Sequence, residues 1–347
     1  MRAAVIGTGR IARQHLNCLN TLPESEVVGV CDLSAVRAEA AAERYQVPRW
    51  FTDHRRLLEE CAPEIVHVTT PVGSHFTLAR DALEGGAHVL LEKPAVRSLD
   101  ELRSLLELAR ERDRYLLEDH NYVFNQPVLQ ALAWARDGRL GSPIHVEVAI
   151  SLDVAAPGSP FVDPNLPPPA DLPGGAIADF VTHLASLPCA FHGAHTAAHP
   201  LWSKLGNSGL PADELRAVVE FDSGTAAISF SANNRPDQFL FAVEGAQMRM
   251  RANLFETGFT VQRTRRAPGP LQALLNGLDE GRRSAGAAVR GLWRKLEGGP
   301  GSYEGLWELV ARTHRQLGRG EEPPVSMEDV ERVNALAFAL LAEAPDA

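Results

Sequence analysis

Short apolar runs alternate with amphipathic segments through the first third of the chain. This alternation predicts a parallel sheet that is covered by helices on both faces. Strands are predicted at Ala3–Ile6, Val27–Cys31, Glu64–Thr69, Ala87–Leu91 and Tyr115–Leu117. Helices are predicted between them, at Ile11–Leu22, Ala35–Tyr45, His54–Cys61, Ser74–Gly85 and Leu99–Arg112. We therefore expect an α/β protein whose N-terminal part is doubly wound.

The pattern changes near Tyr122, and we place a domain boundary there, between residues 1–121 and residues 122–347. After one more helix at Pro127–Arg136, polar and apolar residues alternate as they do in strands with one buried face. These strands are predicted at Ile144–Leu152, Leu215–Phe221, Thr225–Ala232, Phe239–Glu244 and Gln247–Ala252. The second domain is therefore expected to be an α/β domain with an open, mostly antiparallel sheet.

Three further segments complete this outline. Proline and glycine are dense in Ala155–Gly175, which predicts a long loop. A helix is expected over Val325–Ala344, where Ser326 and Asp329 form an acidic variant of the capping box. The segment Arg263–Glu297 is a basic insertion, with eight basic against three acidic residues. We expect it to hold a helix that covers the sheet with its apolar stripe, Val289, Leu292, Trp293 and Leu296. Docking on a partner subunit, on a membrane surface or over a nucleotide-sugar phosphate is the alternative.

The balance of charges narrows the classes of function. The 347 residues include 34 Lys and Arg against 44 Asp and Glu, a formal net charge of −10. Nucleic-acid binding normally needs a basic surface that releases counterions from phosphates, so no nucleic-acid partner is expected. The four cysteines are scattered and form no C-x-x-C pair, which is typical of a protein of the reducing cytoplasm. No segment has the length and apolar character of a membrane span.

A glycine-rich turn follows the first predicted strand and opens the first predicted helix. Gly7, Gly9, Arg10, Ile11 and Ala12 fit the pattern G-x-G-x-x-A. The first glycine permits a tight turn, the second lets the backbone approach a pyrophosphate, and the small third residue allows close packing. The helix N-terminus then faces the anion. This context favours a dinucleotide cofactor over an ordinary glycine turn.

An acidic residue ends the second predicted strand and bears on the choice of cofactor. Asp32 lies 25 residues after Gly7, where a carboxylate can accept hydrogen bonds from the ribose hydroxyls of NAD and repel a 2′-phosphate. A helix N-cap is the simpler role for Asp32, and Ser34 could fill that role equally well. Because Arg37 could hold a phosphate, NAD is favoured and NADP stays open.

Polar residues also follow the next two strands, where an open α/β sheet gathers its reactive groups. Thr70, Pro71 and His75 come after one strand, and Glu92 and Lys93 after the other. The Lys93 ammonium would emerge at the sheet edge, beside a carboxylate. A solvated turn lysine paired with Glu92 is an equally good interpretation of this spacing.

In the second half of the chain, Asp179 and His183 are four residues apart on a predicted helix that begins near Gly175. They share one face of this helix, so the carboxylate could orient the imidazole as a base. A buried histidine with a purely structural role is the simpler interpretation of this spacing.

In order and spacing, these motifs resemble the glucose-fructose oxidoreductase and inositol 2-dehydrogenase family, Gfo/Idh/MocA. The resemblance rests on Gly7–Ala12, Thr70–His75, Glu92-Lys93-Pro94, and Gly174-Gly175 leading to Asp179 and His183. It implies a Rossmann domain followed by an open-sheet domain. It also implies an NAD(P)-dependent oxidoreductase that transfers a hydride between the nicotinamide and a secondary hydroxyl or ketone of a sugar, an inositol or a nucleotide-sugar-like polyol.

The resemblance implies roles for single residues. Lys93 would be the catalytic lysine that bridges nicotinamide and substrate, His183 the acid/base on the reacting hydroxyl, and Asp179 the partner of His183. Thr70, Pro71, His75 and Glu92 would lie at the nicotinamide end of the cofactor, while Asn121 and Tyr122 would contact the substrate. Val181 stands where the family commonly has glycine, so the approach to this helix is expected to differ.

Other interpretations stay open. The protein could bind a dinucleotide without catalysis, or oxidise a sugar transiently and return the hydride, so that an elimination or glycoside cleavage follows. A metal cluster of His183, His192, His195, His199 and Asp179 is disfavoured because Pro188 is expected to end the helix before His192. No metal is therefore predicted. An uncovered sheet face predicts a homodimer or homotetramer.

Overall fold

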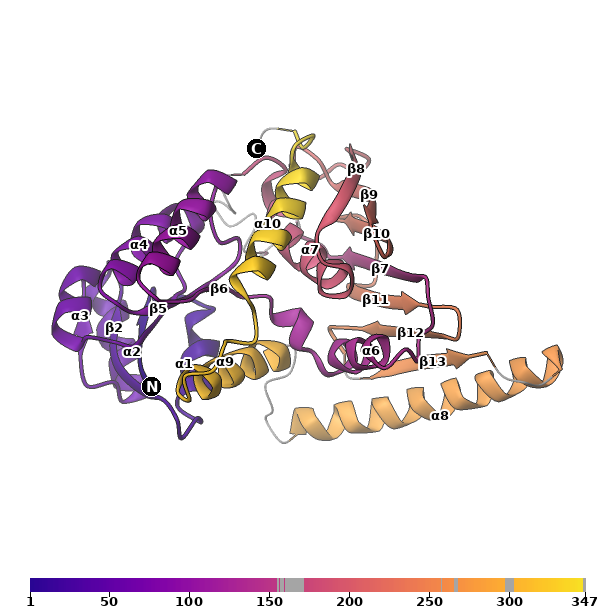
Figure 1. Cartoon of the computed structure of the whole chain (residues 1–347), viewed down its shortest axis with the longest axis horizontal. Helices are drawn as coiled ribbons and strands as arrows, with labels where there is room; N and C mark the ends of the chain where they lie inside the picture. Colours follow the sequence, from indigo (N-terminus) through magenta and orange to yellow (C-terminus); the bar gives the residue numbers. More distant parts are fainter. Residues whose placement is uncertain are drawn as a thin grey trace. The chain divides into compact units, whose positions relative to one another are not determined.

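The computed structural model describes residues 1–154, 156, 159, 172–256, 258–264, 268–296 and 303–345. The chain forms two units, each built on one sheet (Figure 1). The first unit comprises Met1–Asn121 and Leu306–Ala335. The second comprises Tyr122–Gly305 and Leu336–Ala347.

The sheet of the first unit is parallel throughout, as its apolar runs predict. Its strands lie in the order β3-β2-β1-β4-β5-β6. Their bounds are β1 (Arg2–Ile6), β2 (Glu26–Cys31), β3 (Trp50–Phe51), β4 (Ile65–Val68), β5 (His88–Leu91) and β6 (Leu116–Glu118). The order reverses between β1 and β4, and ligands of open α/β sheets bind beside such a switch point. The fold thus places the glycine turn after β1 at the expected binding edge.

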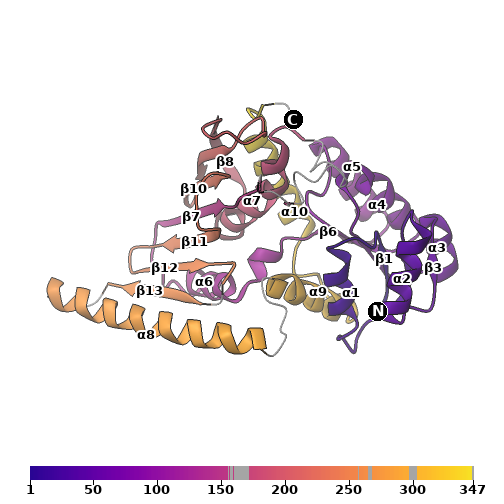
Figure 2. The ribbon, with the colours of Figure 1, turned by 180° about the vertical axis from the view of Figure 1, so that it is seen from behind.

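Helices cover both faces of this sheet. Those within the first 121 residues are α1 (Ala12–Leu19), α2 (Ala35–Tyr45), α3 (His54–Cys61), α4 (His75–Glu84) and α5 (Leu99–Glu111). A short 3-10 helix, η1 (Val72–Ser74), precedes α4. In both ribbon views α4 and α5 lie on one face, and α1 lies beside α9 (Glu304–Leu317) on the other (Figures 1 and 2). The apolar stripe of each helix packs on the sheet, which gives the unit one core per face.

Side-chain caps begin several helices where the sequence predicts them. Ser98 caps α5 by accepting a hydrogen bond from the backbone N–H of Glu101. Ser326 accepts from the backbone N–H of Asp329 and donates its own hydroxyl to the Asp329 carboxylate, which begins α10 (Met327–Leu341). The capping box predicted before α10 is therefore confirmed.

The sheet of the second unit is open and mostly antiparallel, with the order β13-β12-β11-β7-β10-β9-β8. Its strands are β7 (Ile144–Ser151), β8 (His195–Ser203), β9 (Glu214–Phe221), β10 (Gly224–Ser231), β11 (Gln238–Glu244), β12 (Met248–Asn253) and β13 (Phe259–Arg263). Strands β7 and β10 pair in parallel, and the other neighbours pair antiparallel. Alternate residues of β9 are buried, as expected for a sheet with one covered face.

The helices of the second unit include α6 (Gln126–Arg136), α7 (Ala178–His192) and α8 (Gly269–Leu296). Two 3-10 helices precede them, η2 (Asn121–Phe124) and η3 (Gly175–Ile177). Helix α7 packs on β7 and β10, and most of its residues are buried. Helix α8 runs along β13, to which the Asn276 side chain ties it through the backbone of Arg263. Among the described residues, no helix is both long enough and apolar enough to cross a bilayer.

Two features differ from the sequence-based expectations. Residues 306–335 group with the first unit rather than with the residues that precede them. The reason is that α9 and α10 bury polar side chains against the core of the first unit. His314 forms a hydrogen bond with His67, and Asn334 donates one to Glu118. Pro188 was expected to end a helix, yet α7 continues to His192. Burial on both sides of the proline compensates for the lost backbone hydrogen bond.

Two expectations fall outside the described residues. Most of the predicted loop Ala155–Gly175 lies outside the residues that the structure describes. The backbone of α8 is described to Leu296, but the side chains of the expected stripe Val289, Leu292, Trp293 and Leu296 are not.

Candidate functional site

The glycine turn after β1 is held in one conformation by its neighbours. Gly7 has φ +91°, and a Cβ there would lie 2.7 Å from Thr70 Cγ2 and 2.9 Å from the Thr69 carbonyl oxygen. The Thr69 hydroxyl donates to the Gly7 carbonyl at 2.7 Å, and the Gly7 N–H donates to the Cys31 carbonyl at 2.7 Å. The turn is thus tied to both neighbouring strands. Only glycine fits at its first position.

The second glycine is in a different environment. A Cβ built on Gly9 meets no heavy atom within 4 Å, so the space above this backbone is open. The helix α1 that follows begins at Ala12, and its N-cap Ile11 provides no side-chain hydrogen bond. The first N–H groups of a helix lack intrahelical partners and attract anions. Open space over a small residue and an uncapped helix start therefore fit a dinucleotide pyrophosphate.

Asp32 follows β2 and connects it with the glycine turn. Its Oδ2 accepts hydrogen bonds from the Thr8 backbone at 2.9 Å and the Thr8 hydroxyl at 3.0 Å, and its Oδ1 accepts from the Ser34 backbone at 2.9 Å. Partial burial opposes its ionisation, but these hydrogen bonds and the charge of Arg37 outweigh burial and lower the pKa of Asp32. Ser34, rather than Asp32, is the N-cap of α2. The carboxylate is thus ionised and fixed at the sheet edge.

Leu33 was not singled out from the sequence, although it follows this carboxylate directly. Leu33 is 95% exposed. The neighbouring Val36 is 76% exposed. Leu33 and Val36 thus expose apolar side chains close in sequence to the Asp32 carboxylate.

The residues after β4 form a compact loop. His75 is buried, and its Nε2 lies 2.7 Å from the Thr70 carbonyl while its Nδ1 lies 3.1 Å from the Pro94 carbonyl. The Thr70 hydroxyl accepts from Ser74 at 2.7 Å. His75 therefore links the Thr70-Pro71 loop to the turn after β5, and burial lowers its pKa although its hydrogen bonds oppose this. Pro71 precedes η1 in extended conformation.

A buried carboxyl pair lies at the ends of β5 and β6. Glu92 is 6% exposed and Asp119 is 1% exposed. Burial raises the pKa of Asp119 well above its usual range, and the negative charge of Glu92 adds to this. Burial also opposes ionisation of Glu92, but His15 and the charge of Lys93 lower its pKa. The pair therefore holds one proton, on Asp119, while Glu92 is ionised beside Lys93.

Lys93 directly follows Glu92 of this pair and is itself half-buried. Its backbone N–H donates to Glu92 Oε2 at 3.3 Å. The Lys93 charge acts on both Glu92 and Asp119, which distinguishes it from a lysine on a solvated turn. A cation that emerges from a buried acidic site is a candidate for proton chemistry.

The predicted catalytic residues of the second unit lie on α7. Asp179 is half-buried in its first turn, and His183 is buried one turn later. The ring of Tyr122 packs edge-on against His183, with the ring centroids 4.8 Å apart, and against Phe239 at 4.5 Å. An aromatic wall therefore holds the His183 imidazole. The left-handed Gly174 and Gly175 lead into this helix, and Gly174 would meet the Trp202 ring if it carried a Cβ.

The remaining predicted residues are Asn121 and the histidines of the alternative metal cluster. Asn121 is buried at the start of η2. Among the residues that the structure describes, the three side chains that bring potential ligand atoms within 4.8 Å of one another are His15, Glu92 and Asp119. His183 and His192 on α7 and His195 and His199 on β8 are not in this group. Both ring nitrogens of His15 have hydrogen-bonding partners, so a proton site describes this cluster better.

Several buried polar residues of this region were missed from the sequence. His67 is the single polar residue in the apolar run of β4, and His15 lies on the buried face of α1. Glu118 ends β6, and Asp119 and His120 follow it directly. A polar side chain within an apolar run was the signal that could have revealed them.

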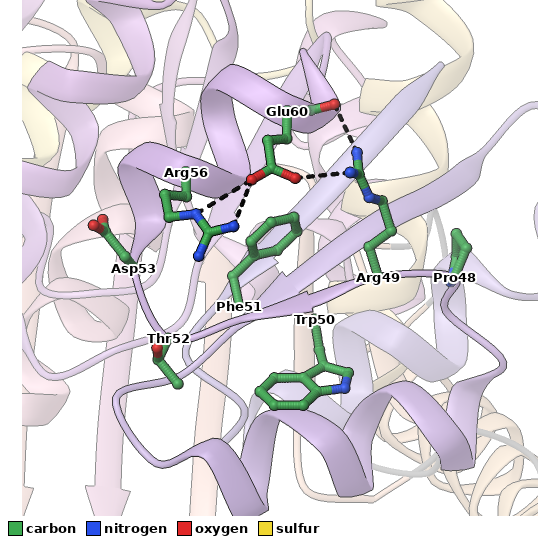
Figure 3. A pocket seen from close by; sticks show the side chains of 8 residues that line it. All are labelled: Pro48, Arg49, Trp50, Phe51, Thr52, Asp53, Arg56 and Glu60. Carbon is green, nitrogen blue, oxygen red and sulfur yellow. Dashed lines mark hydrogen bonds and ion pairs between the residues drawn. The ribbon is translucent and has the colours of Figure 1, made fainter.

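A surface cavity of about 540 Å³ lies elsewhere in the first unit, along β3 and α3 (Figure 3). It is lined by Pro48, Arg49, Trp50, Phe51, Thr52, Asp53, Arg56 and Glu60. Glu60 accepts hydrogen bonds from Arg49 at 2.7 Å and Arg56 at 2.8 Å, so the charges of the lining neutralise one another. It contains none of the predicted site residues, and we assign it no catalytic role.

Comparison with known proteins gives these features a context. Residues 1–120 match the family described as "Oxidoreductase family, NAD-binding Rossmann fold", Gfo/Idh/MocA. A D-xylose 1-dehydrogenase (NADP(+)) of Haloferax volcanii is 24% identical over 73% of this chain and 76% of its own length. A D-glucoside 3-dehydrogenase of Escherichia coli is 31% identical over 44% of this chain and 43% of its own length.

A solved structure resembles the whole chain. Levoglucosan dehydrogenase, in complex with NADH and levoglucosan, superposes with a TM-score of 0.79 over 99% of this chain and 97% of its own. The sequences are 19% identical. This likeness establishes the two-domain fold.

Proposed function

Because the chain belongs to the Gfo/Idh/MocA oxidoreductase family, we propose that it is an NAD-dependent dehydrogenase that oxidises a secondary hydroxyl of a sugar or related polyol. The observation that carries this proposal is the position of Lys93. This half-buried cation directly follows Glu92 of the buried carboxyl pair, at the carboxyl edge of the sheet. The first turn at the same edge fits a pyrophosphate. The named relatives act on sugars, which supports the substrate class.

The first unit holds the cofactor in this proposal. Gly7, Gly9 and the start of α1, with Arg10, Ile11 and Ala12, receive the pyrophosphate. Asp32 accepts hydrogen bonds from the ribose hydroxyls, and its fixed negative charge disfavours a 2′-phosphate. When bound, NAD supplies the hydride acceptor. Arg37 is exposed nearby, so NADP binding is weakened rather than abolished.

The nicotinamide end is assigned to the residues after β4 and β5. Thr70 and Pro71 border the nicotinamide ribose, and His75 positions both loops through its backbone contacts. Glu92 keeps Lys93 charged by its own ionisation, since opposite charges stabilise each other in a buried site. Lys93 then orients the reacting hydroxyl and stabilises negative charge on its oxygen.

The second unit supplies the acid/base and substrate contacts. His183 accepts the hydroxyl proton, and Asp179, four residues earlier on α7, orients the imidazole and stabilises its charged form. Tyr122 fixes the ring by edge contact, and Asn121, which belongs to the first unit, offers an amide to substrate hydroxyls. An imidazole is suited to this role because its pKa lies near neutrality.

A panel of sugars, inositols and nucleotide sugars, each with NAD, tests the proposal through NADH absorbance. We expect at least one polyol to give sustained NADH formation. A product released without accumulated NADH would instead show the redox-neutral alternative, in which the hydride returns to the sugar. Tight NADH binding with no reaction across the panel would favour a non-catalytic dinucleotide-binding protein.

A further inference from the structure

Three buried histidines form a continuous hydrogen-bonded chain in the first unit, between the carboxyl pair and the protein surface. His15, His67 and His314 each have no exposed surface, yet they come from α1, β4 and α9. Helices α1 and α9 lie side by side in both ribbon views (Figures 1 and 2). None of the roles assigned above uses these rings, and burying three imidazoles is costly unless each is fully hydrogen-bonded.

The distances show that they are. His15 Nε2 lies 3.0 Å from Glu92 Oε1, and His15 Nδ1 lies 2.9 Å from His67 Nδ1. His67 Nε2 lies 2.9 Å from His314 Nε2, and His314 Nδ1 lies 2.6 Å from Ser25 Oγ. Ser25 is half-buried, between the exposed residues Glu24 and Glu26. Every ring nitrogen of the chain is therefore used, from a buried carboxylate to the surface.

The protonation of the rings follows from these contacts. A neutral imidazole has one donor and one acceptor nitrogen. With Glu92 ionised, His15 must donate from Nε2, so His67 must donate from Nδ1 and His314 from Nε2, and the Ser25 hydroxyl donates to His314 Nδ1. With Glu92 protonated, every bond reverses its direction. Both arrangements satisfy all four bonds with neutral rings.

We propose that Glu92, His15, His67, His314 and Ser25 form a proton wire that exchanges one proton between solvent and the carboxyl pair. As solvent gives a proton to the Ser25 oxygen, the Ser25 O–H proton passes to His314 Nδ1, and the His314 Nε2 proton passes to His67 Nε2. The His67 Nδ1 proton then passes to His15 Nδ1, and the His15 Nε2 proton passes to Glu92 Oε1. Solvent loses one proton and Glu92 gains one, and the reverse sequence returns it.

The surrounding charges suit a neutral wire. Groups that face it are Lys93, Glu118 and His75 near the carboxyl pair, the N-terminal amino group near His314, and the Glu24–Arg315 pair at the Ser25 end. Burial keeps the pKa of His67 well below its usual range, and the neighbouring histidines add to this. A charged His67 is thereby disfavoured, so the two neutral arrangements suit this central ring.

The role of the wire in catalysis rests on the proposed function. Oxidation of an alcohol releases a proton, and its reverse consumes one. Because Glu92 and Lys93 are adjacent, the wire gives the lysine side of the site a route for proton exchange with solvent.

Proton exchange of the carboxyl pair, measured on the protein without substrate, tests the wire independently of dehydrogenase activity. Infrared spectroscopy identifies the buried carboxylic acid as the C=O stretching band that is lost in Asp119→Asn. After rapid mixing with D2O at neutral pD, the shift of this band reports the exchange of the acid proton for deuterium. His67→Asn should slow this exchange at least about tenfold, because an amide forms hydrogen bonds but does not relay protons. His88→Asn, the same change on the neighbouring strand β5, should exchange at the wild-type rate.

Several results would overturn the proposal. They are exchange at the wild-type rate in His67→Asn, the absence of a carboxylic acid band that depends on Asp119, and a stoichiometric metal bound in the purified protein. If His67→Asn does not fold, His314→Gln on α9 decides the question by the same criterion. Nitrogen NMR of labelled histidine should also find His67 protonated at Nδ1, with His15 and His314 protonated at Nε2, and any other pattern contradicts the wire. If no polyol of the panel reacts but proton exchange is slowed in His67→Asn, the proposed dehydrogenase activity is refuted and the proton wire is supported.

Discussion

Asp32 is the residue on which cofactor choice depends in this account. Its two oxygens are fixed by Thr8 and Ser34, so the carboxylate is presented in one orientation. Asp32→Asn removes the charge that we propose to bind the ribose hydroxyls. The Kd for NADH should then rise about tenfold or more, since hydrogen bonds to charged groups contribute roughly 1.5–3 kcal/mol. The Kd for NADPH should rise less or fall.

Fluorescence titration of both cofactors measures this change, with Ser34→Ala as the control for the cap of α2. A wild-type protein that binds NADPH more tightly than NADH would show that the role assigned to Asp32 is wrong.

His314 makes stability depend on pH. Burial, together with the positive charge of the N-terminus, lowers its pKa from 6.5 to about 3. The unfolded chain therefore binds more protons, so this contribution to stability is complete above pH 6.5 and is lost as the pH falls toward 3. Between pH 7 and pH 5 the free energy of unfolding should fall by about 2 kcal/mol on this account.

Urea unfolding at the two pH values measures this term. His314→Gln should be less stable than the wild type at pH 7, yet its stability should change less with pH. An equal pH dependence in both proteins would contradict the assignment.

At the scale of the elements, the turn between β1 and α1 offers a matched pair of substitutions. Gly7→Ala places a Cβ against the Thr69 carbonyl and requires an unfavourable positive φ, so it should lower the free energy of unfolding by about 2 kcal/mol or more. Gly9→Ala meets open space and should leave thermal stability nearly unchanged. It should nevertheless weaken NADH binding at least about tenfold, because the methyl group occupies the space that a pyrophosphate needs.

Thermal melts and NADH titrations of the two variants separate structure from binding. NADH affinity unchanged in Gly9→Ala would place the pyrophosphate elsewhere.

The sequence predicted most of the elements because their burial is local and periodic. The apolar runs of β1, β2, β4 and β5 are buried on both faces, and Ser98 and Ser326 mark helix starts through bonds made within one turn. What could not be predicted depends on contacts distant in sequence. His314 meets His67 across 247 residues, and Asn334 meets Glu118 across 216, so no local pattern reveals that α9 returns to the first sheet.

The same limit holds for the site. The glycine turn and Asp32 could be proposed from the sequence because their pattern requires a strand, a turn and a helix in succession, and the structure has these elements in that order. Asp119 carries no such pattern, and its protonated state results from burial beside Glu92. A helix that tolerates Pro188 is another case in which packing outweighs local preference.

At the scale of the whole molecule, the outer face of the second sheet is the predicted oligomer contact. Leu201 on β8 is 64% exposed and Val218 on β9 is 55% exposed. Apolar side chains on an open sheet favour association, so we predict a homodimer or homotetramer. Light scattering after size-exclusion chromatography should show smaller particles for Leu201→Glu combined with Val218→Glu. If Leu271→Glu on α8 dissociates the oligomer instead, the contact lies on that helix. A monomeric wild-type protein would refute the prediction of an oligomer.

The central claim is that Lys93 and His183 carry out the chemistry of one dehydrogenase. The most direct measurement is kcat for NADH formation, with whichever polyol of the panel is most active, in Lys93→Met and His183→Asn. Each should lose at least about a hundredfold, as expected when a group that handles the proton or the alkoxide charge is removed. The control variants make the same changes at an exposed cation, in Arg97→Met, and at the far end of α7, in His192→Asn. Each should retain kcat within about twofold, because substitutions away from a site usually have small effects. Full turnover in either Lys93→Met or His183→Asn would contradict the account.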